Sequence, residues 1–320
     1  MEKKYVVGVD VGGQSCKIGV VDAEGNILVQ GVMSSIGFAR GEEFVSSLAA
    51  AISELIDKSG KKGQILGIGV GAPNGNYYTG TIAFAPNLPW AANGSVDFSR
   101  MLTEKLEGIP VALTNDANAA AMGEMTYGIA KGLRHFIMIT LGTGVGSGIV
   151  VNGEVLYGSD GFAGELGHTC AVRHNGRLCG CGKTGCLEAY CSAIGVARTA
   201  REWLDSNDEP SLLRDKEDIS SKDVYEAALK GDILARRVFD FTGHILGAQL
   251  ADFIAFSAPE AIVLFGGLAR AKEFIYEPIM ESMNANTLKI WKNKVKVLFS
   301  SLKESDAAIL GASALAWEFK

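Results

Sequence analysis

The sequence contains no run of basic residues, although nucleic-acid-binding proteins usually cluster lysine and arginine on one face. The net charge of −6 argues against a nucleic-acid partner without excluding one, because folding could still gather lysines together. No long apolar segment is present either. The first apolar run, Val6–Val11, is too short for a signal peptide or a transmembrane helix. We therefore expect a cytoplasmic protein with no membrane partner.

Two common nucleotide-binding motifs are also missing. The chain has neither a P-loop nor a GxGxxG segment that opens a helix, which argues against P-loop NTPases and dinucleotide dehydrogenases. Glycine is in excess instead, with 40 residues among 320, many of them in short clusters beside apolar runs. Such clusters indicate tight turns and close approaches of the backbone to a ligand. The length fits two domains, and no Pro/Ser-rich linker marks the boundary between them.

One supersecondary unit occurs twice in the chain. Residues 5–28 and 136–156 both read as a strand, a glycine turn, a second strand, a turn and a third strand. The other predicted elements are helices over Glu42–Lys58, Ala117–Met125, Ile233–Phe256 and Ala307–Trp317, and a buried strand over Ala261–Phe265. Strands alternating with helices indicate an α/β fold with a mixed sheet in each half, and we place the boundary near residue 120.

The two glycine turns are candidates for phosphate binding. Glycines at a hairpin turn expose backbone N–H groups that can hold phosphate oxygens. Asp10 comes just before the first turn and could hold the Mg²⁺ that accompanies ATP, often through water. The alternative is two ordinary hairpins that use glycine for its positive φ. We favour phosphate binding, because the turns occupy matching positions in the two halves.

Two polar residues, Asn115 and Asp116, follow the strand-like segment that begins at Val111 and precede the alanine-rich helix. Either residue could cap that helix. In α/β folds, ligands bind at the carboxyl ends of strands, which is where this pair lies. An aspartate there can accept the proton of a substrate hydroxyl as the hydroxyl attacks phosphorus. Capping and catalysis are compatible, so we predict that Asp116 is a catalytic base.

Three cysteines and one histidine make a complete ligand set for a structural zinc ion. Cys179, Cys181 and Cys186 are close together, and His168 precedes them, three residues after Glu165. Glycines between the cysteines let the chain fold tightly around a metal. Four protein ligands leave no open position, so the zinc would be structural, and the second nitrogen of His168 could face a substrate hydroxyl. The alternative is three unliganded thiols.

These features together resemble the ROK family of sugar kinases and repressors, within the actin/hexokinase/Hsp70 ATPase superfamily. The resemblance spans essentially the whole chain. Asp10-x-Gly12-Gly13 is similar to the first phosphate motif of the family, and Leu141–Gly148 followed by Gly164–His168 is similar to its signature. Cys179–Glu188 is similar to its zinc motif, the most specific of the set. Two further segments match, Ala85–Trp90 and Asn115–Glu124.

The resemblance implies a role for each matching residue. Asp116 would be the catalytic base. The residues implied to bind the sugar are Asn87, Asn115, Asp116, Glu165, His168 and Glu188. The implied Zn²⁺ ligands are His168, Cys179, Cys181 and Cys186. The residues implied to lie at ATP and its Mg²⁺ are Asp10, Gly12, Gly13, Gly142, Thr143 and Gly144, with Gly266 and Gly267 near the adenosine.

The resemblance also implies an architecture. The fold would be α/β, with two RNase H-like (actin-like ATPase) domains around a central cleft and a structural zinc site. Residues 1–118 would form a small N-terminal domain, on which the C-terminal helix 304–320 packs back. Residues 119–303 would form a large domain that carries the zinc motif. Because the family commonly dimerises, we expect a homodimer.

Two positions depart from the family pattern. The family usually has threonine after the first Gly-Gly, and here Gln14 is followed by Ser15. A longer amide can still donate to phosphate, with a changed geometry. The usual Pro-Gly-Pro turn near the sugar reads Pro73-Asn74-Gly75, and this loop is left out of the predicted site.

The function that these residues favour is ATP-dependent phosphorylation of a hexose, with glucose as the expected acceptor. Two carboxylates, a histidine and paired amides suit a polyhydroxylated ring, because every buried hydroxyl needs a partner. Other acceptors stay open, among them N-acetylmannosamine, N-acetylglucosamine, fructose and allose, as does polyphosphate as the donor. Repressors of the family carry an N-terminal helix-turn-helix, whereas the phosphate motif here begins at Asp10. We therefore expect an enzyme and not a sugar-sensing regulator.

Overall fold

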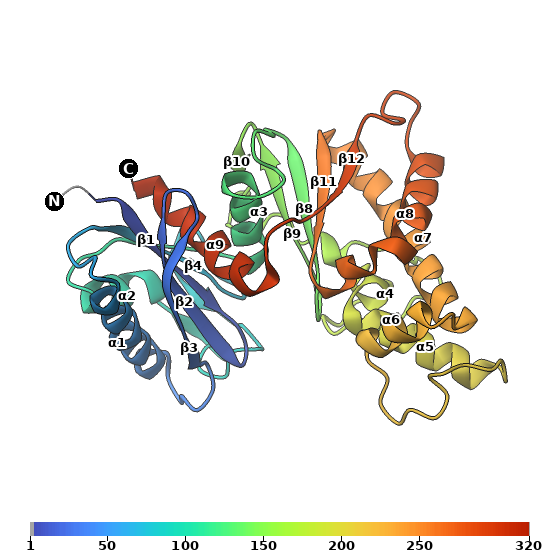
Figure 1. Ribbon diagram of the computed structural model, residues 1–320, viewed down its shortest axis with the longest axis horizontal. Helices are drawn as coiled ribbons and strands as arrows, with labels where there is room; N and C mark the ends of the chain where they lie inside the picture. Colours follow the sequence, from blue (N-terminus) through green and yellow to red (C-terminus); the bar gives the residue numbers. More distant parts are fainter. Residues whose placement is uncertain (1–2, 320) are drawn as a thin grey trace. The chain divides into compact units, whose positions relative to one another are not determined.

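The computed structural model describes residues 3–319 (Figure 1). Contacts divide the chain into two compact units, the first made of Met1–Leu133, Gly148–Gly164 and Ser301–Lys320, the second of Arg134–Ser147 and Glu165–Ser300. Two five-stranded sheets and one two-stranded sheet organise these units. Lys320, at the end of the predicted segment 304–320, lies outside the described residues.

The first five-stranded sheet has the strand order β3-β2-β1-β4-β7. Its strands are β1 (Tyr5–Val11), β2 (Ser15–Asp22), β3 (Ile27–Ser34), β4 (Ile65–Gly71) and β7 (Val111–Thr114). The first three strands are antiparallel neighbours, which confirms the predicted hairpins, and Gly25 in the second turn has a φ of +86°. β4 and β7 run parallel to β1, so the carboxyl ends of these three strands meet at one edge.

Helices cover both faces of this sheet (Figure 1). On one face, α1 (Gly41–Ser59) and α2 (Phe98–Lys105) share a core with alternate residues of β1, including Val7 and Val9. The predicted helix over Glu42–Lys58 is therefore confirmed, with one more residue at each end. On the other face lie α3 (Asp116–Thr126) and α9 (Glu304–Ala316), which pack against each other. A short 3-10 turn, Trp317–Phe319, follows α9.

The C-terminal helix α9 lies very close to β1 and β4. A Cβ atom at Gly69 of β4 would lie 1.9 Å from the carbonyl oxygen of Ala312, and one at Gly8 of β1 would lie 2.1 Å from that of Ile309. No side chain fits in so little space, so glycine at these two positions sets the helix-to-sheet distance.

The two-stranded sheet carries a long loop of the first unit. β5 (Ile82–Ala83) pairs with β6 (Ser95–Val96), and the loop between them contains the motif Ala85–Trp90. Trp90 is buried and stacks on Phe44 of α1, with 4.3 Å between the ring centroids. Its indole N–H donates to the carbonyl oxygen of Ser35. The loop is thus anchored to the core at one point.

The second five-stranded sheet has the order β10-β9-β8-β11-β12, the same pattern as the first. Its strands are β8 (Phe136–Leu141), β9 (Val145–Val151), β10 (Glu154–Val155), β11 (Ala261–Phe265) and β12 (Lys296–Phe299). The division between the units passes through β9. β11 has the bounds that the sequence predicts and runs parallel to β8. The predicted duplication of one supersecondary unit is confirmed.

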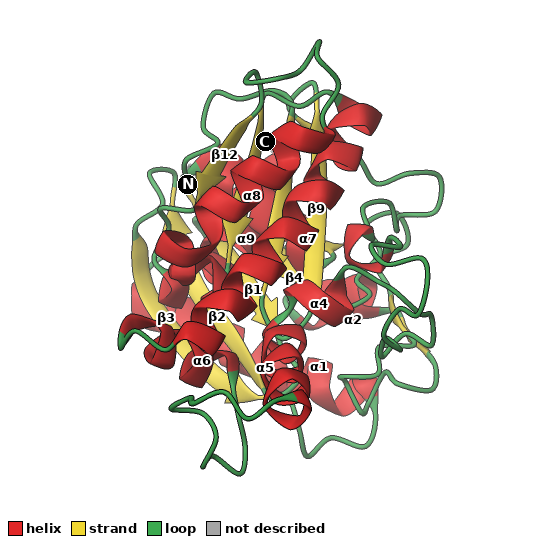
Figure 2. Cartoon of the chain, turned by 90° about the vertical axis from the view of Figure 1, so that its right-hand side faces the viewer, coloured by secondary structure: helices red, strands yellow, loops and turns green. Residues whose placement is uncertain are grey.

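The helices of the second unit pack on this sheet as one core. They are α4 (Glu188–Cys191), α5 (Ala193–Ser206), α6 (Ser221–Leu229), α7 (Ile233–Ser257) and α8 (Lys272–Asn286), with 3-10 turns at Leu166–His168 and Gly267–Ala271. α7 and α8 lie side by side (Figure 2), and Gly243 and Gly247 of α7 meet the backbone of α8. The sequence predicted α7 but not α5, α6 or α8. Within residues 3–319, no helix combines the length and the apolar character needed to cross a bilayer.

The close packing of α9 on Gly8 of β1 and Gly69 of β4 predicts that a larger residue at either position destabilises the fold. We expect Gly69→Ala to push α9 away from β4 and to lower the Tm by about 5–10 °C, the effect of overpacking a well-filled core. Gly94→Ala is the matched control, because a Cβ atom at Gly94 would meet open space. Calorimetric melting of both variants checks the prediction. An unchanged Tm for Gly69→Ala would show that α9 can shift away from β4 without loss of stability.

Candidate active site

The carboxyl edge of the first sheet brings Asp10 and Asp116 together. In the parallel register Asp10 of β1 lies opposite Gly71 of β4, and Gly71 lies opposite Thr114 of β7. A Cβ atom at Gly71 would lie 3.6 Å from the Cα atom of Asp116. Glycine between the two aspartates therefore lets the start of α3 lie over the end of β4.

Asn115 and Asp116 form the start of α3, as the sequence predicts. The Asn115 side chain is the N-cap and accepts from the Ala117 N–H at 2.8 Å. Asp116 Oδ1 accepts from the same N–H, also at 2.8 Å. This shared donor orients both side chains. The amide nitrogen of Asn115 has no hydrogen-bond partner among residues 3–319, which leaves a donor for a ligand.

The charge of Asp116 contributes to the raised pKa of Asp10. Burial, with the Asp116 charge as a second cause, raises the pKa of Asp10 from 3.8 to about 6, while Lys17 opposes the shift. Lys17 lies directly opposite Asp10 on β2. Burial also raises the pKa of Asp116, opposed by the Ala117 N–H. Carboxylates held close together in this way favour a cation or a proton at the site.

The first glycine turn lies against the loop that contains Asn87. A Cβ atom at Gly13 would lie 3.0 Å from the Asn87 carbonyl oxygen. Gly12 closes the turn by donating to the Ser15 carbonyl at 3.0 Å. Among the described residues, none accepts from the Gly13 N–H. An unpaired N–H at a tight turn is what an anion site requires.

The second glycine turn joins β8 to β9. The Gly142 N–H donates to the Gly144 carbonyl at 3.0 Å, and the Gly142 carbonyl accepts from Ala193 at the start of α5. The Thr143 N–H has no partner in the described part of the chain. Gly266 (φ +105°) follows β11, and its Cβ atom would lie 2.6 Å from the Leu141 carbonyl oxygen. Gly142–Gly144 and Gly266–Gly267 therefore meet at one edge of the second sheet.

A cavity of about 480 Å³ opens beside this turn. Thr143 lines it together with Ile194 and Arg198 of α5 and with Asp218 and Ser220, which precede α6. The sequence did not predict the last four residues as site residues. They belong to no motif, and only the packing of α5 and α6 brings them to the turn.

His168 and the three predicted cysteines form one cluster. Their four ligand atoms all lie within 4.8 Å of one another. The Sγ atoms of Cys181 and Cys186 are 3.7 Å apart, and Cys179 Sγ is 3.9 Å from His168 Nδ1. The Lys183 N–H lowers the pKa of the Cys181 thiol, whereas burial raises that of Cys179 to about 12. The cluster can hold one tetrahedral metal ion.

Glu188 connects this cluster to the second glycine turn. Its Oε2 accepts from the Val145 N–H at 3.0 Å, and its Oε1 accepts from Cys179 Sγ at 3.4 Å. The carboxylate is half-buried at the start of α4. The sequence assigned Glu188 to the sugar and gave no sign of these two contacts. Each carboxylate oxygen keeps a second lone pair for a further donor.

Each unit thus holds part of the predicted site. The first unit contains Asp10, Gly12, Gly13, Asn87, Asn115 and Asp116. The second contains Gly142, Thr143, Gly144, Glu165, His168, Cys179, Cys181, Cys186, Glu188, Gly266 and Gly267. Glu165 is exposed, and its carbonyl accepts from the His168 N–H at 3.1 Å. Gly167 between them passes directly under the Val145 carbonyl oxygen, 2.0 Å from where its Cβ atom would lie.

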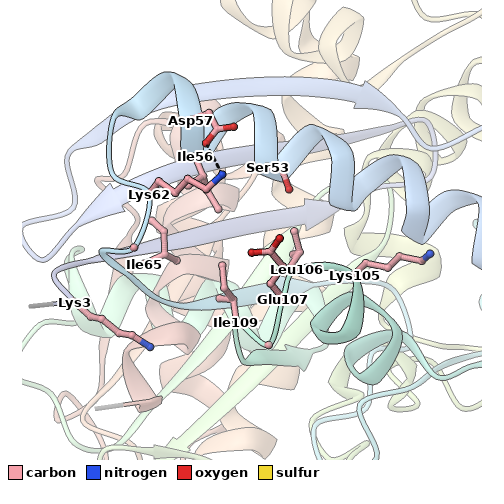
Figure 3. A pocket seen from close by; sticks show the side chains of 12 residues that line it. Lys3, Ser53, Ile56, Asp57, Lys62, Ile65, Lys105, Leu106, Glu107 and Ile109 are labelled. Atoms are coloured by element: carbon pink, nitrogen blue, oxygen red, sulfur yellow. Dashed lines mark ion pairs between the residues drawn. The ribbon is translucent and has the colours of Figure 1, made fainter. Parts of the chain in front are cut away.

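A hollow of about 440 Å³ lies at the opposite edge of the first sheet (Figure 3). Lys3 before β1, Ile65 at the start of β4 and Ile109 before β7 line it, and its rim carries the ion pair of Lys62 with Asp57. These are the amino ends of the parallel strands. The hollow contains none of the predicted site residues, so it does not belong to the candidate active site.

The raised pKa of Asp10 predicts a pH-dependent stability. Because the folded pKa exceeds the unfolded one, the folded state binds the proton more tightly, and stability falls as the pH rises from about 4 to 6. We expect Asp10→Asn to remove this penalty and to raise the free energy of unfolding by about 1–2 kcal/mol at pH 7.5 after allowance for solvent screening. The gain should shrink as the pH is lowered towards 5.

Urea unfolding at both pH values, without nucleotide or Mg²⁺, measures the effect. Asp205→Asn is the control, because Asp205 is exposed. Equal stability of Asp10→Asn and the wild type at pH 7.5 would contradict the prediction.

Comparison with known proteins identifies the relatives of this chain. The profile of the ROK family matches residues 6–318. The glucokinase of Halalkalibacterium halodurans is 36% identical over 319 residues, which cover 97% of this chain and 94% of that protein. The glucokinase of Thermotoga maritima is 33% identical over 319 residues, covering 98% of each. A ROK family glucokinase from Streptomyces griseus, solved in complex with glucose and AMPPNP, has a TM-score of 0.79 at 32% identity and covers 98% of this chain and 99% of its own.

These matches extend over almost the full length of the chain and of its relatives. They agree with the mixed α/β architecture and with the duplicated strand order described above, which is consistent with an actin-like ATPase. The chain belongs to the ROK family.

Proposed function

We propose that this chain is an ATP-dependent sugar kinase that phosphorylates a hexose, with glucose to glucose 6-phosphate as the main reaction. The observation that carries the proposal is the position of Asp116 beside Asp10 at the carboxyl edge of the first sheet. The glucokinases among its relatives, at 33% and 36% identity, support glucose as the acceptor. Another hexose or an N-acetylhexosamine is the alternative acceptor.

In the proposed reaction, Asp116 acts as the general base. Its raised pKa makes the carboxylate a better proton acceptor, and the Ala117 N–H fixes its orientation. The sugar hydroxyl loses its proton to Asp116 as its oxygen attacks the γ-phosphorus, and ADP leaves. Protein atoms crowd the Asp116 carboxylate and raise its pKa, but the residue keeps exposed surface through which a substrate can reach it. Positioning of the two reactants accounts for most of the remaining rate enhancement.

The nucleotide is proposed to bind at the glycine turns. The N–H groups of Gly13 and Thr143 are available to phosphate oxygens, and Gly12, Gly142 and Gly144 let the backbone approach them. We place the nucleoside at the cavity beside Thr143, near Gly266 and Gly267. Asp10 fits the Mg²⁺ that accompanies ATP, because a carboxylate with a raised pKa gains from a nearby cation. Bound Mg²⁺ would supply charge neutralisation of the phosphates.

Polar side chains are proposed to bind the sugar. They are Asn87, Asn115 and Asp116 of the first unit and Glu165, His168 and Glu188 of the second. The free amide nitrogen of Asn115 supports its role, since it can donate to a sugar oxygen. For Glu188 we propose a double role, because the same carboxylate also fixes the second glycine turn through Val145.

A structural zinc ion is proposed for His168, Cys179, Cys181 and Cys186. With metal–sulfur bonds of about 2.3 Å, the edge of a tetrahedron measures about 3.8 Å. The observed Sγ–Sγ separation of Cys181 and Cys186 is 3.7 Å. This pair of cysteines therefore has the separation that a tetrahedral zinc site requires. Coordination through Nδ1 would leave His168 Nε2 free for a sugar hydroxyl.

We further propose two domains, one made of residues 1–118 with helix 304–320 and the other of residues 119–303. The packing of α9 on β1 and β4 supports this division. We also propose a cytoplasmic location and a homodimer.

Sugar-dependent ADP release with Mg-ATP tests the proposed function. We expect the wild type to respond most strongly to glucose in a panel of hexoses and N-acetylhexosamines, and Asp116→Asn to lower kcat by about 10²–10⁴-fold. Asp205→Asn is the control for a charge change on the surface. A stronger response to another sugar would identify that sugar, and not glucose, as the acceptor. Full activity of Asp116→Asn would show that another group is the base. A wild type that responds to no sugar would contradict the proposed kinase activity.

Metal analysis of the purified protein tests the zinc proposal. We expect one zinc ion per chain, its loss in Cys181→Ser, and a lower Tm in that variant because metal binding contributes to folding. Cys170→Ser is the matched control, because Cys170 is an exposed cysteine outside the cluster. A wild type that binds no zinc even after reconstitution would favour the alternative of unliganded thiols.

A further inference from the structure

Phe84 has a backbone conformation that bulky residues rarely adopt. Its φ is +51°, in the left-handed region, where the Cβ atom of an aromatic residue crowds the backbone. Such strain persists only where the surrounding structure maintains it. Burial of the ring is not the reason, because the side chain is 67% exposed. The fold therefore holds an exposed aromatic residue in an unfavourable conformation.

The side chain of Asn74 maintains this conformation. Its Nδ2 donates to the carbonyl oxygens of Ala83 at 3.1 Å and of Phe84 at 2.9 Å. The Phe84 N–H donates to the Gly94 carbonyl at 3.0 Å. Both backbone polar groups of Phe84 are therefore fixed. Asn74 itself has a φ of +53°, which asparagine tolerates better than most residues.

These contacts tie the strained residue to the candidate active site. Asn74 follows Gly71 by three residues, and Gly71 lies beneath the start of α3 at Asp116. Phe84 opens the loop that contains Asn87, whose carbonyl lies against Gly13 of the first glycine turn. All these residues belong to the first unit. The amide of Asn74 thus links the turn after β4 to the loop predicted to bind the sugar.

Local structure alone does not require phenylalanine at this position. Glycine would adopt the same φ without strain, and a single exposed aromatic side chain contributes little to stability. A pyranose presents C–H groups on its faces and hydroxyl groups around its edge. Aromatic rings in ligand sites supply apolar contact for such faces, while polar side chains bind the edge. An exposed ring held in a fixed conformation is available for such a contact.

We propose that Phe84 is a specificity-determining residue whose ring packs against the C–H face of the acceptor sugar. Asn74 is the positioning residue that holds it there. The identity of the acceptor sugar in this proposal rests on the proposed function. The proposal also gives a role to Asn74 in Pro73-Asn74-Gly75, where the family usually has Pro-Gly-Pro. A glycine at position 74 would lack the side-chain amide that donates to the carbonyl oxygens of Ala83 and Phe84.

Two variants separate a role in sugar binding from a role in the fold. Phe84→Gly removes the ring and the strain together. We expect its Tm to equal or exceed that of the wild type, its KM for glucose to rise about tenfold, and its KM for ATP to change less than about twofold. Asn74→Gly keeps the left-handed turn but removes both amide bonds, and we expect the KM for glucose to rise in the same direction.

Controls and direct binding make the outcome decisive. Asn293→Gly replaces another left-handed asparagine, and Phe256→Ala removes another exposed phenylalanine, so neither should change the KM for glucose. Calorimetric titration of glucose without ATP measures affinity independently of turnover. Wild type that binds glucose without phosphorylating it would contradict the proposed function, and the Kd of Phe84→Gly would still test the inference. Affinity for glucose unchanged in Phe84→Gly, or a wild type that binds no sugar, would overturn it.

Discussion

The parallel register of β1, β4 and β7 is the constraint on which the first unit depends. It aligns Asp10, Gly71 and Thr114 across the sheet, and the chain leaves each strand at the same edge. Two carboxylates consequently lie close together at this edge, and the charge of Asp116 makes the ionised form of Asp10 less favourable. This arrangement reduces the stability of the free protein. It suits the proposed site, which would receive a cation with its nucleotide and a proton from its substrate.

Close backbone contacts make this edge possible. Gly71 lets α3 start directly over the sheet, and Gly8 and Gly69 let α9 approach from the same side. Gly13 brings the first turn against the loop of Asn87 by the same means. Glycine suits these four positions because neighbouring atoms crowd the place of a Cβ atom, and at Gly8 and Gly69 they leave no room for one.

In the second unit, side-chain hydrogen bonds of Glu188 connect separate segments of the chain. Glu188 accepts from the second glycine turn with one oxygen and from the cysteine cluster with the other. A metal bound by His168 and the cysteines would require the thiolate form of Cys179, which has no proton to donate to Glu188, so Glu188 would keep only its contact with the Val145 N–H. The cysteine cluster and the second glycine turn are separate in sequence, and Glu188 contacts both.

The sequence by itself determined the features that rest on local patterns. The glycine hairpins, the repeated strand order, the cap at Asn115 and the four-residue metal set were all predicted, because turn chemistry, hydrophobic periodicity and ligand spacing act over a few residues. Only the tertiary structure decided the rest. The helices α5, α6 and α8, the cavity at Thr143, the two partners of Glu188 and the hold of Asn74 on Phe84 have no local signature. They depend on contacts between residues far apart along the chain, and such contacts exist only once the sheets and helices have packed.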